Sequence, residues 1–134
     1  GALGKRLILK VEDVMRKEGE NPIVDEDTLV KDVLVRITGA RAGSASVTDK
    51  KGRLSGIFTD GDLRRRLEAD EGILLRRVKD VMTPSPKVIT KEKLAADALR
   101  IMKDNKIDEV PVVDARGRPA GLVDVQDLLR AGLV

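Results

Sequence analysis

Apolar positions with helical spacing occur at two places in the chain, and the two places correspond. In the first half, the i, i+1, i+4, i+5 and i+8 positions typical of one helix face are Leu29, Val30, Val33, Leu34 and Ile37. The five positions 65 residues later are also apolar: Leu94, Ala95, Ala98, Leu99 and Met102. This correspondence predicts an amphipathic helix in each half and indicates an internal repeat.

Short apolar runs around the two expected helices predict three strands in each half. After each helix, two runs flank a glycine-containing turn, Lys50–Arg53 in the first half and Ala115–Arg118 in the second. Such a turn between apolar runs is typical of a β-hairpin. Before each helix, a shorter strand is expected to end at Val24 or at Val88.

A closing helix is predicted after the last strand of each half. It is expected to begin near Asp60 in the first half and near Val125 in the second. Leu63 and Leu67 in the first helix, and Leu128 and Leu129 in the second, are expected to face the core. Each half therefore has the order β-α-β-β-α. Because a unit of about 60 residues buries too little surface to be stable alone, the two halves are expected to pack together.

The chain is thus predicted to have an α+β (α/β) fold, in which two repeats pack sheet to sheet about a pseudo-twofold axis. We expect the first repeat over residues 11–69, a charged connector over 70–77 and the second repeat over 78–134. Residues 1–10 begin without Met and are interpreted as the remnant of a linker from a preceding domain.

Composition narrows the possible functions. The 134 residues are 41% hydrophobic and 37% charged, which is typical of a globular, cytoplasmic protein, and no apolar run approaches a membrane span. Cys and His are both absent, so thiolate sites and the commonest general base and metal ligand are excluded. With a net charge of +3, interleaved charges and one aromatic residue, nucleic-acid binding is not expected.

The stretch Gly56–Leu63 carries the candidate chemistry, and it recurs as Gly121–Leu128. Each copy predicts a buried strand that runs into a helix N-terminus, where backbone N–H groups favour an anion. Thr59 and Asp62 could hold a phosphate and a sugar there. The same pair also fits a capping box, in which Thr and the acid three residues later satisfy the helix N-terminus.

The repeat resembles the tandem CBS-domain pair, or Bateman module. The resemblance is carried by the Asp-Val-Met sequences at 13–15 and 80–82 and by the two strand-to-helix sequences. It implies two nucleotide clefts between the repeats, with Thr59 on phosphate and Asp62 on ribose. In the second copy Asp124 replaces the hydroxyl and would repel phosphate, so that cleft is expected to be empty or to accept less anionic groups.

A narrower resemblance is to bacterial arabinose-5-phosphate isomerases. It rests on GALGKRL at the start, GIFTDGDLRRRL in the middle and DLLRAGLV at the end. It implies a sugar-isomerase domain that precedes this region, in an enzyme of Kdo and lipopolysaccharide synthesis. The chain would then be a non-catalytic regulatory piece of a homodimer, within a possibly tetrameric parent protein.

The implied ligand is a nucleotide or nucleotide sugar: CMP-Kdo, the activated end product, or an adenine nucleotide such as AMP or ATP. No metal or other cofactor is expected. The alternative is a purely structural dimerisation module whose clefts are vestigial.

Candidate ligand contacts follow from the motif and the resemblance together. Arg64 or Arg65 could reach a phosphate, and Asp108 and Glu109 could accept hydrogen bonds from a base amino group. For most of the surrounding loop residues, ordinary turn and strand positions are an equally good interpretation. The full candidate set is Val24, Ser44, Ala45, Ser46, Thr59, Asp60, Asp62, Arg64, Arg65, Met82, Thr83, Pro84, Lys87, Val88, Ile107, Asp108, Glu109, Val110, Pro111, Asp124 and Asp127.

Overall fold

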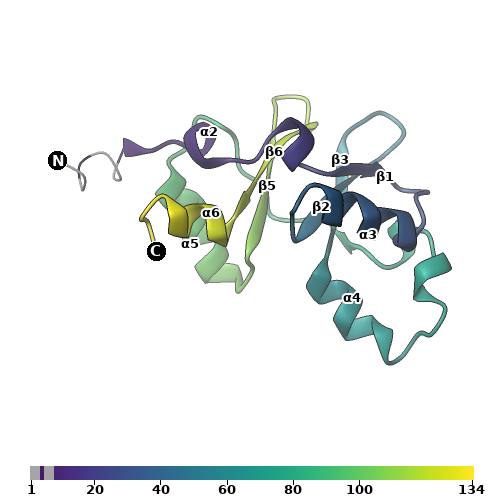
Figure 1. Cartoon of the computed structure of the whole chain (residues 1–134). Coiled ribbons are helices and arrows are strands. Elements are labelled where there is room, and N and C mark those ends of the chain that lie inside the picture. Colours follow the sequence, from purple (N-terminus) through teal and green to yellow (C-terminus); the bar gives the residue numbers. More distant parts are fainter. Residues whose placement is uncertain (1–3, 5–7) are drawn as a thin grey trace.

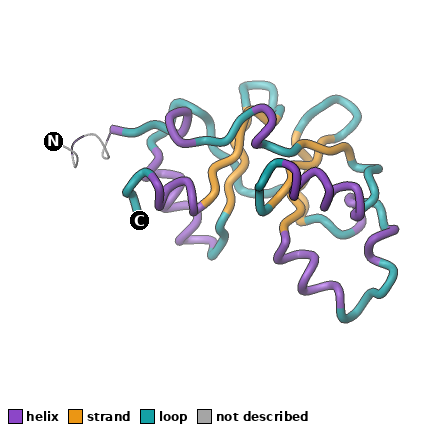
Figure 2. The backbone as a smooth tube through the Cα atoms, in the orientation of Figure 1, coloured by secondary structure: helices purple, strands orange, loops and turns teal. Residues whose placement is uncertain are grey.

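The computed structural model describes residue 4 and residues 8–134. The expected linker remnant at residues 1–10 lies largely outside the described residues and stays a prediction. The first half has the predicted order: β1 (Ile23–Asp25), α3 (Val30–Gly39), β2 (Ser44–Thr48), β3 (Leu54–Thr59) and α4 (Asp60–Leu67). Figure 1 shows this half beside the second, and Figure 2 shows where the helices, strands and loops lie along the chain.

The second half contains α5 (Ala95–Asn105), β5 (Glu109–Val113), β6 (Pro119–Asp124) and α6 (Val125–Arg130). Its expected leading strand is reduced to a single parallel bridge between Ile89 and Val112. The cause lies just before it: Ser85 has a φ of 46° that turns the chain, and Pro86 has no N–H to donate to a ladder.

Short elements connect the two halves and open each of them. The segment α2 (Val11–Val14) and the 3₁₀ turn Glu18–Glu20 precede β1. The 3₁₀ turns Ile73–Leu75 and Val78–Asp80 and the two-residue strand β4 (Thr83–Pro84) lie between the halves. These segments bring the repeats into contact.

The opening segment of each repeat packs against the other repeat. The strand β4 extends the sheet of the first half, whose order is β1-β2-β3-β4, by pairing antiparallel with β3. Correspondingly, Arg16 forms an antiparallel bridge with Leu122 of β6. Val11 lies in the core of the second half, and Val78 lies in the core of the first. The units that pack together are therefore not identical to the stretches that repeat in sequence.

A glycine–methionine contact holds each opening segment in place. The side chain of Met82 lies directly over Gly56 of β3, and that of Met15 lies over Gly121 of β6. A Cβ at either glycine would overlap the methionine. The glycine at the start of each strand-to-helix sequence is thus required by close approach of the opposite repeat.

Alternation along the strands separates the cores from the surface between the two sheets. Phe58 and Val123 are fully buried in the cores of the first and second half. Their neighbours Ile57 and Leu122 are also buried but belong to neither core cluster. Since successive strand residues point to opposite faces, these side chains lie between the sheets, as sheet-to-sheet packing requires.

The closing helices bury less than the sequence predicts. Leu67 is 50% exposed and Leu129 is 46% exposed, so the expectation that both face the core is wrong. Both lie near the C-terminal ends of short helices, α4 and α6, and Figure 1 shows α4 projecting away from the sheet of the first half. Only Leu128 of α6 is fully buried, while Leu63 of α4 is partly buried against the first core.

Candidate functional site

The N-terminus of α4 is closed by the predicted capping box. Thr59 Oγ1 accepts a hydrogen bond from the Asp62 N–H at 3.0 Å, and Asp62 Oδ2 accepts one from the Thr59 N–H at 2.9 Å. Both hydrogen bonds of the cap are made within the chain itself. Because the Thr59 hydroxyl acts as an acceptor here, its own O–H remains available as a donor.

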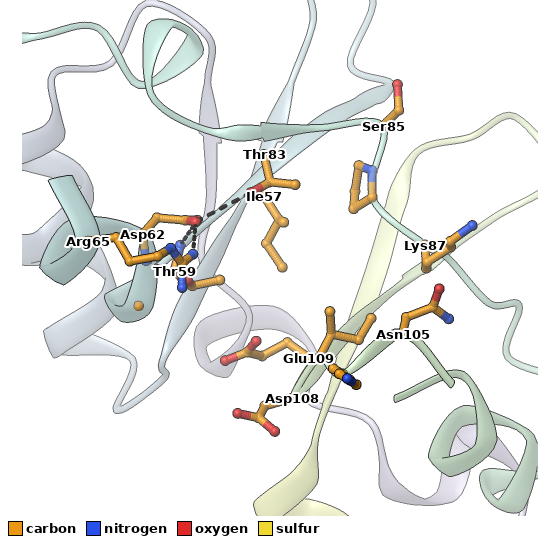
Figure 3. Close-up of a pocket in the computed structure, with 14 residues that line it drawn as sticks. Ile57, Thr59, Asp62, Arg65, Thr83, Ser85, Lys87, Asn105, Asp108 and Glu109 are labelled. Atoms are coloured by element: carbon orange, nitrogen blue, oxygen red, sulfur yellow. Dashed lines mark hydrogen bonds and ion pairs between the residues drawn. The ribbon is translucent and has the colours of Figure 1, made fainter. Parts of the chain in front are cut away.

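The second oxygen of Asp62 is engaged by two side chains. Arg65 Nη2 lies 2.5 Å from Asp62 Oδ1, and Thr83 Oγ1 lies 3.4 Å from the same atom. The Asp62 carboxylate is only 8% exposed, whereas the Arg65 side chain is 71% exposed. An exposed Arg65 side chain thus lies over a buried carboxylate (Figure 3).

A cleft of about 430 Å³ opens beside this carboxylate. Figure 3 shows Thr59, Asp62, Arg65 and Thr83 on one side and Asn105, Asp108 and Glu109 on the other. Thr59, Asp62 and Arg65 belong to the first repeat, and Asn105, Asp108 and Glu109 belong to the second. Thr83 comes from the opening segment of the second repeat, which packs on β3. A cleft of this size is typical of small-molecule sites. We call it the first cleft.

Both signs of charge line the first cleft. Arg65, Lys87 and Lys106 supply cations, and Asp108 and Glu109 supply carboxylates opposite Thr59. Burial, followed by the nearby Asp124 and Asp108 carboxylates, raises the pKa of Glu109 to about 7. Near neutral pH, Glu109 can therefore donate or accept a hydrogen bond, depending on its protonation state.

Glycine keeps the floor of the first cleft open. A Cβ at Gly61 would lie 3.4 Å from Thr59 Oγ1 and 3.3 Å from Arg65 Nη1. It would therefore fill the space between the hydroxyl and the guanidinium. That space is where an anion could meet both donors.

Eight of the candidate residues line the first cleft: Thr59, Asp62, Arg65, Thr83, Lys87, Ile107, Asp108 and Glu109. The structure places the others elsewhere. Among those facing away, Arg64 is exposed and Val88 lines a separate cavity. The hydrophobic cores contain Val24, Ala45, Val110 and, partly buried, Met82.

The remaining candidates lie on the strands or at the second helix start. Three candidates are buried on strands: Ser44 and Ser46 of β2 and Pro111 of β5. In the strand register, Ser44 pairs with Thr59, Ser46 with Ile57 and Pro111 with Leu122. Asp60 donates its N–H to Gly43 O, and Pro84 pairs with Gly56. Asp124 and Asp127 occupy the equivalent cap of α6.

Six lining residues were not in the candidate set: Ile57, Gly61, Ser85, Pro86, Asn105 and Lys106. Ile57 and Gly61 lie inside the recognised strand-to-helix sequence, and alternation would have placed Ile57 on the same face as Thr59. Ser85 and Lys106 both have a positive φ, at 46° and 53°. Their loop conformations carry no sequence signal, since neither residue is glycine.

The equivalent position in the second repeat, which we call the second cleft, is filled differently. Asp127 Oδ2 accepts from the Asp124 N–H at 3.1 Å and pairs with Arg16 Nε at 3.2 Å. Asp124 Oδ1 accepts from the Gln126 N–H. Burial is the main cause that raises the pKa of the Asp124 carboxyl.

Neither a metal centre nor a membrane span is found in the part of the chain that the structure describes. Over residue 4 and residues 8–134, no three Asp or Glu side chains are grouped to hold a metal ion. Within the same range, every helix is too short or too polar to cross a bilayer.

A family model described as CBS domain matches residues 11–69 and 78–134. Arabinose 5-phosphate isomerase KdsD of Pseudomonas aeruginosa is 50% identical over 136 residues, covering 100% of this chain but 41% of that protein. The chain thus spans about two fifths of the length of the curated relatives it matches.

Solved structures agree with the fold. The CBS-pair protein CBSX2 from Arabidopsis thaliana, in complex with AMP, has 29% identity and a TM-score of 0.77, covering 93% of this chain and 96% of its own. The CBS domain pair of protein MJ0100 has a TM-score of 0.82 at 22% identity, covering 92% of this chain and 94% of its own, and supports the fold alone. This chain belongs to the CBS-domain family, as a tandem pair homologous to the CBS region of arabinose 5-phosphate isomerases.

Proposed function

We propose that this chain is a ligand-sensing module that binds a nucleotide or nucleotide sugar in the first cleft. The observation that carries the proposal is the meeting of Thr59, Asp62 and three cationic side chains around one open cavity of about 430 Å³. A phosphate would sit above Gly61, between the Thr59 hydroxyl and Arg65. The similarity to CBSX2, whose structure contains AMP, supports the class of ligand.

The contacts of Asp62 suggest how a sugar would bind. A ribose hydroxyl donating to Asp62 Oδ1 would replace Arg65, whose Nη2 contacts that atom. The displaced guanidinium would then be free for the phosphate, a geometry that suits its forked donors. Asp108 or Glu109 would accept from a base amino group on the opposite wall.

The parent protein would be an arabinose 5-phosphate isomerase of Kdo and lipopolysaccharide synthesis, located in the cytoplasm. In it, the module would regulate a preceding sugar-isomerase domain, with CMP-Kdo as feedback ligand or an adenine nucleotide as effector. The CBS pair itself would be non-catalytic and homodimeric. Regulation would require a ligand with different affinities for two arrangements of the repeats.

Thermal denaturation with AMP, ATP, CMP and CMP-Kdo tests ligand binding. A ligand present at about 100 times its Kd is expected to stabilise the fold by about 2.7 kcal/mol, which raises the Tm by several degrees. If none of the four raises the Tm, the alternative of a purely structural dimerisation module is favoured. Light scattering of the same samples then measures the oligomeric state on which that alternative depends.

The variant Thr59→Val is expected to weaken binding of the nucleotide that raises the Tm by roughly tenfold or more, since a hydrogen bond from a hydroxyl to a phosphate is charge-assisted. Thr59→Ser retains the hydroxyl and should bind nearly as the parent chain does. Titration calorimetry measures both. If instead Asp124→Thr changes affinity as much as Thr59→Val, the phosphate has been assigned to the wrong cleft.

The variant Gly61→Ala is expected to weaken phosphate-dependent binding while leaving the Tm unchanged or slightly higher. Its methyl group would occupy the phosphate position, whereas alanine is the better residue in a helix. The nucleoside that lacks the phosphate is the matched control ligand. Equal loss of nucleotide and nucleoside affinity would contradict this placement.

A further inference from the structure

The two clefts have the same backbone construction but different closing side chains. In the first cleft, Thr83 of β4 pairs with Ile57 of β3. In the second, Arg16 forms a bridge with Leu122, and the two pairs occupy equivalent positions of the repeat. A threonine therefore stands at the wall of one cleft where an arginine stands at the wall of the other.

Arg16 extends into the second cleft and is held there by two acceptors. Its Nε pairs with Asp127 Oδ2 at 3.2 Å, and its Nη1 donates to the carbonyl oxygen of Arg41 at 3.0 Å. The side chains of Arg16 and Asp127 are each 11% exposed. By contrast, the Arg65 side chain that covers Asp62 in the first cleft is 71% exposed.

The charges of the second cleft explain why a cation is needed there. Asp124 and Asp127 lie close together in a mostly buried position. Burial is the largest cause that raises the pKa of Asp124, the Asp127 carboxylate raises it further, and the Gln126 N–H and Arg16 lower it. Removal of Arg16 would leave Asp127 with only the exposed Arg130, whose Nη1 lies 3.7 Å from Asp127 Oδ1, which is costly for carboxylates that are mostly buried. Arg16 also joins α6 to the loop that precedes β2, so it connects the two repeats through side chain and backbone.

We propose that Arg16 occupies the second cleft as a built-in cation and closes it, so that each chain has one open ligand cleft. The statement about ligand number rests on the proposed function. The closure itself does not, because it concerns only contacts within the chain.

The absence of Cys from the sequence allows a direct test of closure with one introduced thiol. Ser44 is fully buried, and its Oγ has no hydrogen-bond partner among the residues that the structure describes. It lies 65 positions before Glu109, which lines the first cleft, and so occupies the equivalent position of the first repeat. The Ser44→Cys chain is reacted with iodoacetamide with and without Arg16→Thr. Opening of the cleft is expected to raise the alkylation rate of this thiol roughly tenfold or more, just as local opening speeds amide hydrogen exchange.

Ala45→Cys is the matched control, because Ala45 is equally buried but faces the first core. Its rate should not change with Arg16→Thr. If the two thiols accelerate equally, the effect is general unfolding and closure by Arg16 is refuted, as it is if Ser44→Cys does not accelerate. Arg16→Met, which keeps the aliphatic stem, replaces Arg16→Thr should that variant fail to fold.

Titration calorimetry with AMP then measures how many AMP molecules each chain binds. The parent chain should bind one AMP, and the double variant Arg16→Thr with Asp124→Thr should bind two. Two equivalent sites in the parent chain would overturn the proposal. No AMP binding in either protein would count against AMP as the ligand in the proposed function, while the alkylation rates still decide closure.

Discussion

Replacing Gly121 with alanine is expected to lower the melting temperature of this protein by roughly 5–10 °C. A Cβ at this position would lie 2.8 Å from the backbone oxygen of Arg16 and 2.7 Å from Met15 Sδ. The backbone oxygen cannot move alone, since it accepts from the Leu122 N–H at 2.9 Å. The new methyl group must therefore displace the opening segment from β6, a loss of roughly 1–3 kcal/mol.

Two other glycines provide a graded comparison in the same denaturation experiment. At Gly56 the three atoms nearest to the new methyl all belong to the flexible Met82 side chain, so Gly56→Ala should cost less. A Cβ added at Gly39, the last residue of α3, would meet no described atom within 4 Å apart from its chain neighbours and its own helix backbone. Gly39→Ala should therefore be neutral or slightly stabilising. Similar Tm values for Gly121→Ala and Gly39→Ala would disprove the close-approach explanation.

Replacing Glu109 with glutamine is expected to stabilise the protein at pH 8 and to have little effect near pH 5. Burial and the facing carboxylates of Asp124, Asp108, Asp62 and Asp60 raise the pKa of Glu109 from 4.5 to about 7. The folded state therefore favours protonated Glu109 more than the unfolded state does. This contribution to stability is fully present below about pH 4.5 and is lost as the pH rises through about 7.

The measurement is the Tm of both proteins between pH 5 and pH 8. The Tm of the parent chain should fall relative to that of Glu109→Gln as the pH rises. Glu109 is only partly buried, and Lys87 and Lys106 line the same cleft. The expected difference between the two proteins in the free energy of unfolding at pH 8 is therefore only roughly 1–2 kcal/mol. The exposed Glu71→Gln is the control, and parallel pH profiles for parent and Glu109→Gln would contradict the prediction.

Much of the fold could be predicted because its signals are local. The helical spacing from Leu29 to Ile37, matched 65 residues later, was enough to predict α3 and α5. The hairpin turns at Gly52 and Gly117 have a φ of 78° in both copies, a conformation that glycine adopts readily. The capping pair Thr59 and Asp62 was also readable, since a cap is made within four residues.

The candidate site was predicted only in part, for the same reason. The residues on α4 are fixed by local geometry, whereas Asn105 and Lys106 reach the cleft only because the two repeats face each other. Val88 was expected at the cleft, but it lines another cavity, although its neighbour Lys87 lines the cleft. A position in sequence next to a lining loop does not determine which way a side chain points.

The sequence by itself determined the repeat, the order of elements and the capped helix that opens beside Thr59, because each depends on residues close in the chain. Only the tertiary structure decided that each opening segment packs on the opposite repeat and that Arg16 enters the second cleft to meet Asp127. That pairing joins residues 111 positions apart, and the register of the Arg16–Leu122 bridge sets it. Asp124 alone indicated that the clefts differ, and packing between the repeats determines how.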